Sequence, residues 1–435
     1  MKKVWKALSI FALCFILASC SQGEAKESAK TETDSGKIEV EFWYPFTGKI
    51  QEANEKSVEE FNKSQDKIHV TAVGQVDYAD IEQKVRQSVP AGTAPDVYIN
   101  VINSVVGLGL DGITQPLTPF IEADKEFDMN DFYEGIVSST NYNGEQWGLP
   151  YFNSTCLLYY NKTLFEEYGI DPASLDTWAG MEAAAKTFSE KGKTGILTNE
   201  SMWIYESFIY SAKNSPFSEK LDKVNFDTPE GKKTISFISD LIREGYWDFP
   251  VPYNAANAET MKQKFFSQEG GMFFGSTANL SNFLEGAKEN GWELGAAMMP
   301  MDQEHAATVG GSNIVMVNGM DDETAQAAWE FIKFMTSPEN NAFGSEHTGY
   351  LPIRKSVAES EERKALEEKE PLYSVARKQL EFTKPAPTVP AYQEVFKIYN
   401  EMLESLVSDP SITVDEAIET ATQRANEAIA SKPLK

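Results

Sequence analysis

Stretches with the alternation and composition of strands are separated by stretches of helical period near the start of the folded chain. The strand-like stretches are "KIEVEFWY" from Lys37, "KIHVTAV" (67–73) and "PDVYINVI" (95–102). Between them, residues 51–64 place apolar side chains on one helical face, and Asp77 begins a second helical stretch. This β-α-β-α-β order predicts a parallel sheet with right-handed crossovers. Ligands bind beyond the carboxyl ends of such strands, which is where Tyr44, Tyr78 and Asn103 lie.

The same mixture of strand and helix patterns continues to the end of the chain. Residues 160–300 read as mixed α/β with aromatic-rich helices, among them residues 201–212. Residues 324–336 have helical spacing, and so does the segment after Thr413, which starts with the capping-box pair Thr413 and Glu416. We therefore predict an α/β protein with two lobes.

The first 37 residues have a different character. Three lysines precede the apolar run at residues 7–18, which is too short for a typical membrane-spanning helix. The run ends in Leu17-Ala18-Ser19-Cys20, which is similar to a bacterial lipobox, so we predict cleavage before Cys20 and lipidation of its thiol. An ordinary cleaved signal or a short anchor is the alternative. Residues 1–19 are then a lipoprotein signal peptide, and residues 20–37 are a disordered tether on the extracellular face of a Gram-positive cytoplasmic membrane.

Charge and cysteine content narrow the class of partner. The 435 residues include 39 Lys and Arg against 66 Asp and Glu, a formal charge of −27. Removal of residues 1–19 takes away three lysines and no acid, so the mature chain carries −30. This balance argues against nucleic acid as a partner. With Cys20 acylated, Cys156 would have no disulfide partner.

Motifs for cofactors, metals and catalysis are weak. Gly107, Gly109 and Gly112 match GxGxxG, but Pro116 and Pro119 follow in place of a helix, which is typical of a loop or edge strand. The three histidines lack ligand spacing, and there is no HExxH, CxxC or GxSxG. We predict no cofactor and no metal. Paired carboxylates of an exported glycoside hydrolase stay open as an alternative, because 66 acids offer many pairs.

Aromatic residues beside small and polar ones favour a sugar-binding surface. Any one of them is more often core packing, but together they could stack on sugar rings. Gly310 and Ser276 lie in stretches that supply hydrogen-bond donors at bends. In "GLPYFNSTCLLYYNK" (148–162), strand alternation turns Asn153 and Thr155 to one side and Ser154 to the other. We predict that Ser154 faces the ligand.

Several stretches together identify a family resemblance. They are "GTAPDVY" (92–98), "LYYNKTLFEEYGID" (158–171), "GAAMMP" (295–300), "VGGSNIVMV" (309–317), "TGYLPIRKS" (348–356) and "TVDEAIETATQRAN" (413–426). The chain resembles the family 1 extracellular solute-binding proteins of ABC importers, most of all the glycerol-3-phosphate-binding members and more distantly the maltose-binding ones. The resemblance implies a monomeric receptor, not an enzyme, whose lobes close on a small ligand and present it to the transmembrane subunits of a permease. The implied lobes are residues 38–148 with about 310–352, and 149–309 with about 353–435.

The resemblance also implies a set of ligand-binding residues. These are Tyr44, Tyr78, Asn103, Ser154, Trp203, Ser276, Gly310, Tyr350 and Phe396. Two positions depart from the glycerol-3-phosphate-binding pattern: Ile102-Asn103 replaces a glutamate that holds hydroxyls, and "VPAYQEVFK" lacks the arginine that grips phosphate. Phe396 falls where maltose-binding members have a stacking tryptophan. We therefore expect a neutral sugar or a glycerophosphodiester ahead of glycerol 3-phosphate itself.

Overall fold

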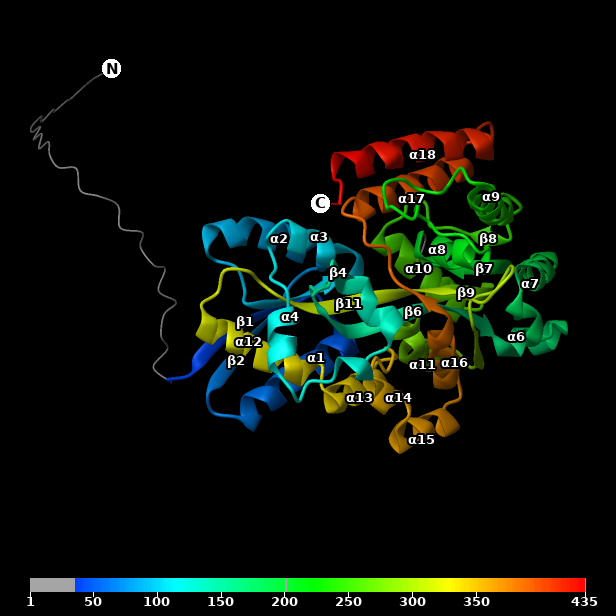
Figure 1. Cartoon of the computed structure of the whole chain (residues 1–435). Helices are drawn as coiled ribbons and strands as arrows, with labels where there is room; N and C mark the ends of the chain where they lie inside the picture. The colour runs from blue at the N-terminus through cyan, green and yellow to red at the C-terminus, as the bar shows by residue number, and fades with distance from the viewer. Residues whose placement is uncertain (1–35, 200–201, 435) are drawn as a thin grey trace, which may run out of the picture.

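One mixed sheet runs through the whole molecule (Figure 1). The structure is a computed structural model that describes residues 36–199 and 202–434. The strand order is β2-β1-β3-β11-β6-β9-β7-β8, and β10 pairs with β6 while β12 pairs with β11. The strands of this sheet are β1 (Ile38–Tyr44), β2 (Ile68–Gly74), β3 (Val97–Val101), β6 (Leu149–Asn161), β7 (Thr194–Thr198), β8 (Trp247–Asp248), β9 (Gly270–Ser276), β10 (Leu294–Ala297), β11 (Ala307–Met316) and β12 (Thr383–Lys384). A small separate hairpin joins β4 (Asn141–Tyr142) to β5 (Glu145–Gln146).

The first lobe confirms the predicted β-α-β-α-β order. β1 pairs in parallel with both β2 and β3. Helix α2 begins where the Asp77 carboxylate accepts a hydrogen bond from the backbone N–H of Asp80 at 2.8 Å. Two helices from the later part of the chain return to this lobe and pack with α1 and β1. The main helices here are α1 (Gly48–Ser64), α2 (Tyr78–Ala91), α12 (Asp322–Met335) and α13 (Pro338–His347).

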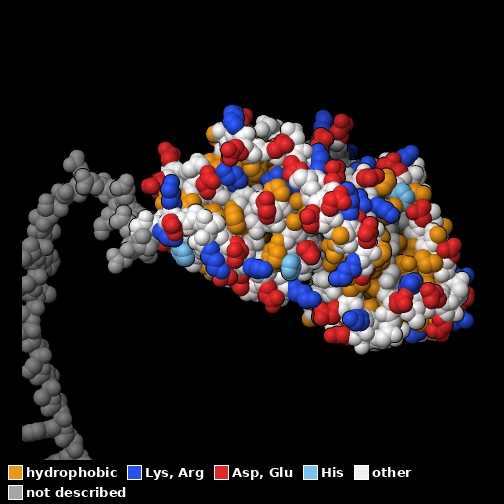
Figure 2. Space-filling view, turned by 90° about the horizontal axis from the view of Figure 1, so that it is seen from below, with side chains coloured by type: hydrophobic (Ala, Val, Ile, Leu, Met, Phe, Trp, Pro, Cys, Tyr) orange, Lys and Arg blue, Asp and Glu red, His pale blue; other side chains and the backbone are white. Residues whose placement is uncertain are grey.

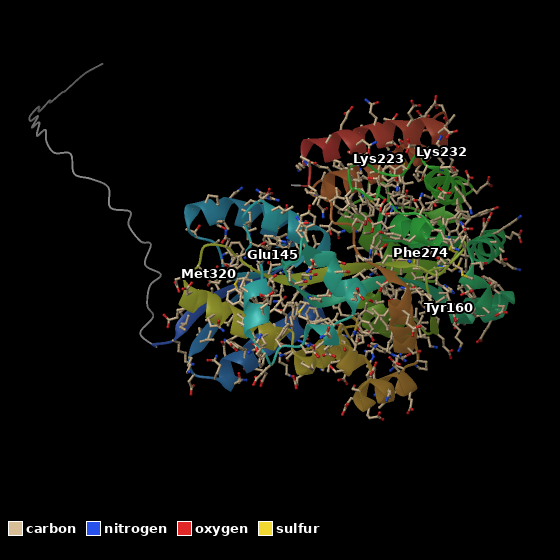
Figure 3. All side chains as sticks on the ribbon, in the orientation of Figure 1. Glu145, Tyr160, Lys223, Lys232, Phe274 and Met320 are labelled. Carbon is tan, nitrogen blue, oxygen red and sulfur yellow. The ribbon has the colours of Figure 1, made fainter. Side chains whose placement is uncertain are left out.

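The second lobe surrounds the other end of the sheet with helices. Phe274 of β9 is fully buried in its core, and Lys232 of α9 forms an ion pair of 2.9 Å with Asp415 of the last helix, α18 (Figure 3). The predicted capping box is confirmed, because Thr413 and Glu416 bond to each other's backbone N–H. The helices of this lobe are α6 (Lys162–Tyr168), α7 (Trp178–Glu190), α8 (Met202–Ser211), α9 (Pro229–Arg243), α10 (Ala255–Phe266), α11 (Leu280–Glu289), α17 (Tyr392–Ser408) and α18 (Val414–Ser431).

The long strands β6 and β11 connect the two lobes. Leu149 at the start of β6 packs in the core of the first lobe, whereas Leu158 near its end packs in the core of the second. β11 likewise pairs with β3 in the first lobe and with β12 beyond it. The lobe limits in residue numbers stay a prediction. The shorter helices are α3 (Val105–Leu110), α4 (Thr118–Ala123), α5 (Glu134–Val137), α14 (Lys355–Ala358), α15 (Glu361–Lys369) and α16 (Leu372–Gln379).

The crossing strands are irregular at the point where they change lobes. The register of the β6–β11 pair shifts between Gly311 and Ser312, which is the mark of a β-bulge. Gly311 has φ of 90°, and a Cβ there would lie 2.3 Å from the carbonyl oxygen of Phe152. Only glycine fits this position without strain. Phe152 itself has φ of 53°, so the strand turns just before Asn153.

Gly107 and Gly109 of the GxGxxG stretch are helical, whereas residues 111–117, in the segment expected as a loop or edge strand, lie outside helices and long strands. Gly107 and Gly109 lie inside α3, and a Cβ on Gly109 would lie 2.2 Å from the Trp147 ring. Close packing of this tryptophan therefore accounts for Gly109. Of the following residues, Thr114 forms an isolated bridge with Val317, and Pro119 lies in the first turn of α4.

The surface carries many charges, with acids and bases interspersed over the face shown in Figure 2. Among the described residues, none of the helices combines the length and apolar character needed to cross a membrane. The predicted signal peptide, Cys20 and residues 20–35 of the predicted tether lie outside the described residues.

Candidate functional site

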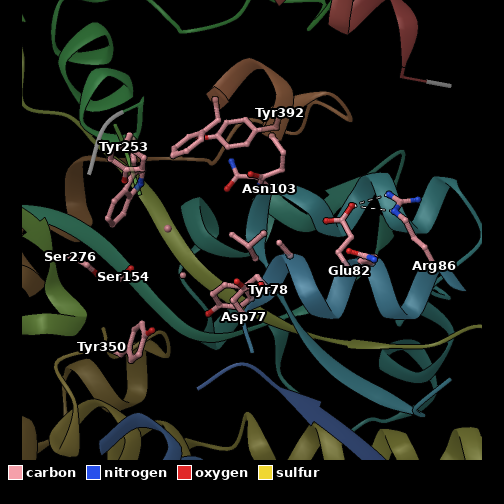
Figure 4. Close-up of a pocket in the computed structure, with 18 residues that line it drawn as sticks. Asp77, Tyr78, Glu82, Arg86, Asn103, Ser154, Tyr253, Ser276, Tyr350 and Tyr392 are labelled. Atoms are coloured by element: carbon pink, nitrogen blue, oxygen red, sulfur yellow. Dashed lines mark hydrogen bonds and ion pairs between the residues drawn. The ribbon is translucent and has the colours of Figure 1, made fainter. Parts of the chain in front are cut away.

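A cavity of about 1000 Å³ lies between the two lobes, beside the crossing strands (Figure 4). Both lobes and both crossing strands line it. The first lobe contributes Asp77, Tyr78, Ala79, Glu82, Gln83, Arg86, Val101 and Asn103; the crossing strands contribute Ser154, Gly310 and Gly311; and Trp203, Tyr253, Ser276, Tyr350, Tyr392, Gln393 and Phe396 complete the lining.

The wall of the first lobe is the beginning of α2 and the residues after β3. Tyr78 is the first residue of α2, and burial raises the pKa of its phenol to about 12. The phenol is therefore neutral and can donate a hydrogen bond at physiological pH. The amide nitrogen of Asn103 donates to the carbonyl oxygen of Pro387 at 3.3 Å. Asn103 thus already links the first lobe to the segment that leads into α17.

The floor of the cavity is backbone from the crossing strands. Gly310 of β11 lies opposite Ser154 of β6, and both line the cavity. A Cβ on Gly310 would lie 2.4 Å from the Trp203 ring, so the missing side chain lets this ring approach the strand. Asn153 and Thr155 make structural bonds instead: the Asn153 amide donates to the Gly310 carbonyl at 3.2 Å, and the Thr155 hydroxyl donates to the Thr308 carbonyl at 3.3 Å.

The wall of the second lobe is mainly aromatic. Trp203 comes from α8, Tyr392 and Phe396 from the first turns of α17, and Tyr253 from the loop before α10. The Tyr253 ring meets the Phe396 ring edge-on with centroids 5.9 Å apart, and its hydroxyl donates to the Asn199 carbonyl at 2.9 Å. These bonds hold the aromatic faces in place, as a stacking surface requires.

The charges in the cavity favour an uncharged ligand. Among the described residues that line it, Arg86 is the only lysine or arginine. Its guanidinium is paired with the carboxylates of Asp111 at 2.7 Å and Glu82 at 3.1 Å. Asp77 adds another acid to the lining. A phosphate group would therefore have to compete with two carboxylates for this arginine.

The structure brings eight of the nine predicted site residues together and leaves one out. Tyr44 does not line the cavity. Its side chain is 2% exposed, and its hydroxyl donates to the Glu55 carboxylate of α1. Side chains alternate along a strand, so Tyr44 shares the face of Val40 and Phe42, which packs against the core of the first lobe. The eight that do line the cavity are Tyr78, Asn103, Ser154, Trp203, Ser276, Gly310, Tyr350 and Phe396.

Several lining residues were not predicted from the sequence. Tyr78, Glu82 and Arg86 follow one another at four-residue spacing, which places them on one face of α2. Tyr392 and Phe396 have the same spacing on α17. The sequence shows this four-residue spacing on both helices, so it could have pointed to Glu82, Arg86 and Tyr392. Tyr253 lies in an irregular segment and had no such signal.

Across the parts of the chain that the structure describes, no group of three or more His, Cys, Asp or Glu side chains is arranged to hold a metal ion.

Comparison with known proteins identifies the fold and the family. Residues 56–371 match the bacterial extracellular solute-binding proteins. The chain belongs to this family. It is 25% identical over 413 residues to the sn-glycerol-3-phosphate-binding periplasmic protein UgpB of Escherichia coli (strain K12), an alignment that covers 89% of this chain and 92% of that protein. The relatives compared are solute-binding proteins of transport systems, and this solute-binding protein is accordingly the receptor component of an ABC importer.

Solved structures share the two-lobed fold. UgpB of Mycobacterium tuberculosis, in complex with glycerophosphocholine, superposes with a TM-score of 0.79 at 20% identity, covering 91% of this chain and 100% of that one. The sugar-binding protein MalE of Xanthomonas citri superposes with a TM-score of 0.78 at 22% identity, covering 91% and 98%. These similarities confirm the predicted fold class of two α/β lobes with a cleft between them.

Proposed function

We propose that this solute-binding protein captures a neutral carbohydrate in the cavity between its lobes. Six aromatic side chains surround one cavity in which the only arginine among the described lining residues is already paired with two acids, and this observation carries the proposal. Sugar rings offer apolar C–H faces to aromatic rings and hydroxyls to polar groups. The six aromatic residues are Tyr78, Trp203, Tyr253, Tyr350, Tyr392 and Phe396.

Polar groups for the sugar hydroxyls lie among these rings. Ser154, Ser276 and Asn103 offer side-chain hydrogen bonds, and Gly310 offers backbone. Because the lining comes from both lobes, a ligand that touches both favours the closed arrangement over the open one. The closed protein then presents the sugar to the permease, and no bond in the sugar is broken.

A glycerophosphodiester is the second candidate. The similarity to UgpB proteins favours it, because UgpB of M. tuberculosis was solved with glycerophosphocholine. Arg86 would have to bind the phosphate of this ligand, and to do so it would have to break its ion pair with Glu82 or Asp111. A phosphate monoester such as glycerol 3-phosphate carries more charge and fits this acidic lining less well.

We place the protein outside the cytoplasmic membrane, as its periplasmic and extracellular relatives are. The lipid anchor at Cys20, the Gram-positive setting and a monomeric state complete the proposal, supported by the lipobox and by the family. Radiolabelled palmitate incorporation that is lost in Cys20→Ala tests the anchor. Soluble secretion of the unsubstituted chain would contradict it.

A ligand panel tests the function. Maltose, maltotriose, glycerophosphocholine and sn-glycerol 3-phosphate are added to the purified protein, and thermal unfolding and calorimetric binding are measured. A bound ligand stabilises by RT ln(1 + [L]/Kd), about 2.7 kcal/mol at 100-fold excess over Kd. Absence of a shift with every compound would refute the substrate class, and hydrolysis of maltotriose would favour the glycosidase alternative.

The affinity of Trp203→Ala tests whether the ligand binds in this cavity. Removing a central aromatic anchor is expected to cost about 2 kcal/mol, or about thirtyfold in Kd. Phe382→Ala is the control, because Phe382 is an exposed aromatic outside the cavity lining. Equal affinity of the two variants would remove Trp203 from the site.

A further inference from the structure

A carboxyl group lies buried directly behind the aromatic wall. Glu206 of α8 has 0% of its surface exposed. The Tyr392 hydroxyl donates a hydrogen bond to its Oε1 atom at 2.7 Å. Its Oε2 atom is also buried and has no hydrogen-bond partner among the described residues. The group therefore makes one strong contact, and that contact is with a residue of the cavity lining.

Glu206 connects the two helices that supply most of the aromatic wall. Trp203 lies three residues before it on α8, close to one helical turn away. Tyr392 is the first residue of α17, and Gln393 and Phe396 of the same first turns also line the cavity. The Glu206–Tyr392 bond thus fixes the start of α17 against α8, and with it the position of three lining side chains (Figure 4 shows Tyr392 above the cavity).

None of the described lysine or arginine side chains forms an ion pair with this carboxyl. Tyr392 of α17 lowers the pKa of Glu206 through its hydrogen bond, and Glu206 in turn raises the pKa of Tyr205 and Tyr210 on its own helix. Asp227, just before α9, faces Tyr205. Among the described residues, α9, β6 and β11, which pack against α8, give Glu206 no ion-pair partner. Burial therefore raises the pKa of Glu206 to about 8, although the bond from Tyr392 opposes this rise.

We propose that Glu206 is a positioning residue that holds Tyr392 at the cavity through their hydrogen bond, and that ligand affinity falls when this buried carboxyl loses its proton. The inference rests on the proposed function of the cavity. Ligand binding and lobe closure replace water beside Tyr392 with a less polar solute. A charged Glu206 loses more solvation in this step than a neutral one. Binding therefore favours the protonated acid, and the protein takes up protons when it binds ligand above neutral pH.

The experiment compares four proteins at pH 6.0 and pH 9.0 with maltotriose and glycerophosphocholine as probes. They are the unsubstituted protein, Glu206→Gln, Tyr392→Phe and the control Glu167→Gln, which replaces an exposed acid of α6. Calorimetry in buffers of different ionisation enthalpy gives Kd and the protons taken up. The unsubstituted protein and the control are expected to lose affinity up to tenfold per pH unit above the pKa of Glu206. Glu206→Gln is expected to bind equally at both pH values, with no proton uptake from this site.

Tyr392→Phe separates positioning from a general effect of burial. It keeps the aromatic ring but removes the hydroxyl that bonds to Glu206. We expect weaker binding at pH 6.0, and a pH profile displaced to higher pH, because the lost bond favoured the ionised acid.

The results distinguish failure of this inference from failure of the proposed function. Binding at pH 6.0 with the same pH profile in the unsubstituted protein and Glu206→Gln overturns the inference and leaves the proposed function intact. If neither probe binds at pH 6.0, the proposed function fails. The inference is then tested by carbon-13 NMR, in which the Glu206 carboxyl is identified as the resonance that is missing in Glu206→Gln. The inference is overturned if this resonance titrates with the ordinary pKa of a glutamate, or if Tyr392→Phe leaves its pKa unchanged.

Discussion

Replacing Glu206 with glutamine is expected to stabilise the ligand-free protein, by an amount that grows with pH. Between the ordinary value of 4.5 and about 8, the folded protein keeps the proton of Glu206 whereas the unfolded chain releases it. The free energy of unfolding therefore falls as pH rises through this window. Below pH 4.5 this group has no effect on it, and above pH 8 the group causes no further change. Raising the pKa from 4.5 to about 8, at about 1.4 kcal/mol per pH unit, sets a ceiling of about 5 kcal/mol.

Glutamine keeps the shape of the protonated acid, and its amide oxygen can accept the Tyr392 hydrogen bond. Its amide nitrogen replaces Oε2, which has no described partner. Because the protonated acid and the amide both leave a donor unpaired at this position, the two proteins are expected to differ little in stability near pH 4. At pH 8 relaxation around the charge leaves about 2 to 5 kcal/mol of gain for Glu206→Gln. Melting temperatures measured from pH 4.5 to 8.5 give this difference, with Glu167→Gln as the exposed control. The reasoning would be refuted if the difference in melting temperature between Glu206→Gln and the unsubstituted protein did not change with pH, or if Glu206→Gln were the less stable protein at pH 8.

Three further substitutions test other parts of the structure. Gly310→Ala places a Cβ 2.4 Å from the Trp203 ring, so displacement of the ring is expected to lower sugar affinity about tenfold in calorimetry; unchanged affinity would contradict the close packing. Arg86→Gln is expected to lower affinity for glycerophosphocholine more than tenfold but for a neutral sugar less than threefold, and equal losses would refute the distinction. Thr413→Ala removes the capping box with Glu416 and is expected to cost about 1 kcal/mol in denaturant unfolding, without a change in ligand affinity.

The first lobe could be predicted from the sequence because its signals are local. The strand pattern of β1, the helical face of α1 and the cap at Asp77 all lie within a few residues of the structure they specify. Tyr44 shows the limit of the same reasoning. Its place at the carboxyl end of β1 was right, but the side chain follows the strand alternation and turns toward Glu55 instead of the cavity.

The second wall of the cavity depends on contacts between distant parts of the chain. Glu206 and Tyr392 are 186 positions apart, and nothing near either residue indicates that they bond. Tyr253 likewise reaches the cavity from a segment without helical or strand pattern, held by Asn199 and Phe396. Such residues become visible only when the packing of α8 against α17 is known, because tertiary contacts and not local propensity place them.

The polar triplet of β6 shows how one strand serves both structure and binding. Three polar side chains in a buried strand would each cost free energy if they lacked partners. Asn153 and Thr155 are bonded to carbonyl groups of β11, where the strand bends between the lobes. Ser154, on the opposite side, lines the cavity together with Gly310 across the strand pair. The bulge at Gly311 makes this division possible, because it bends the ladder while the two neighbouring polar groups satisfy the backbone around it. The link between the lobes and the floor of the cavity are therefore one piece of sheet, so under the proposed function a ligand that bonds to Ser154 would act on the strands that join the lobes.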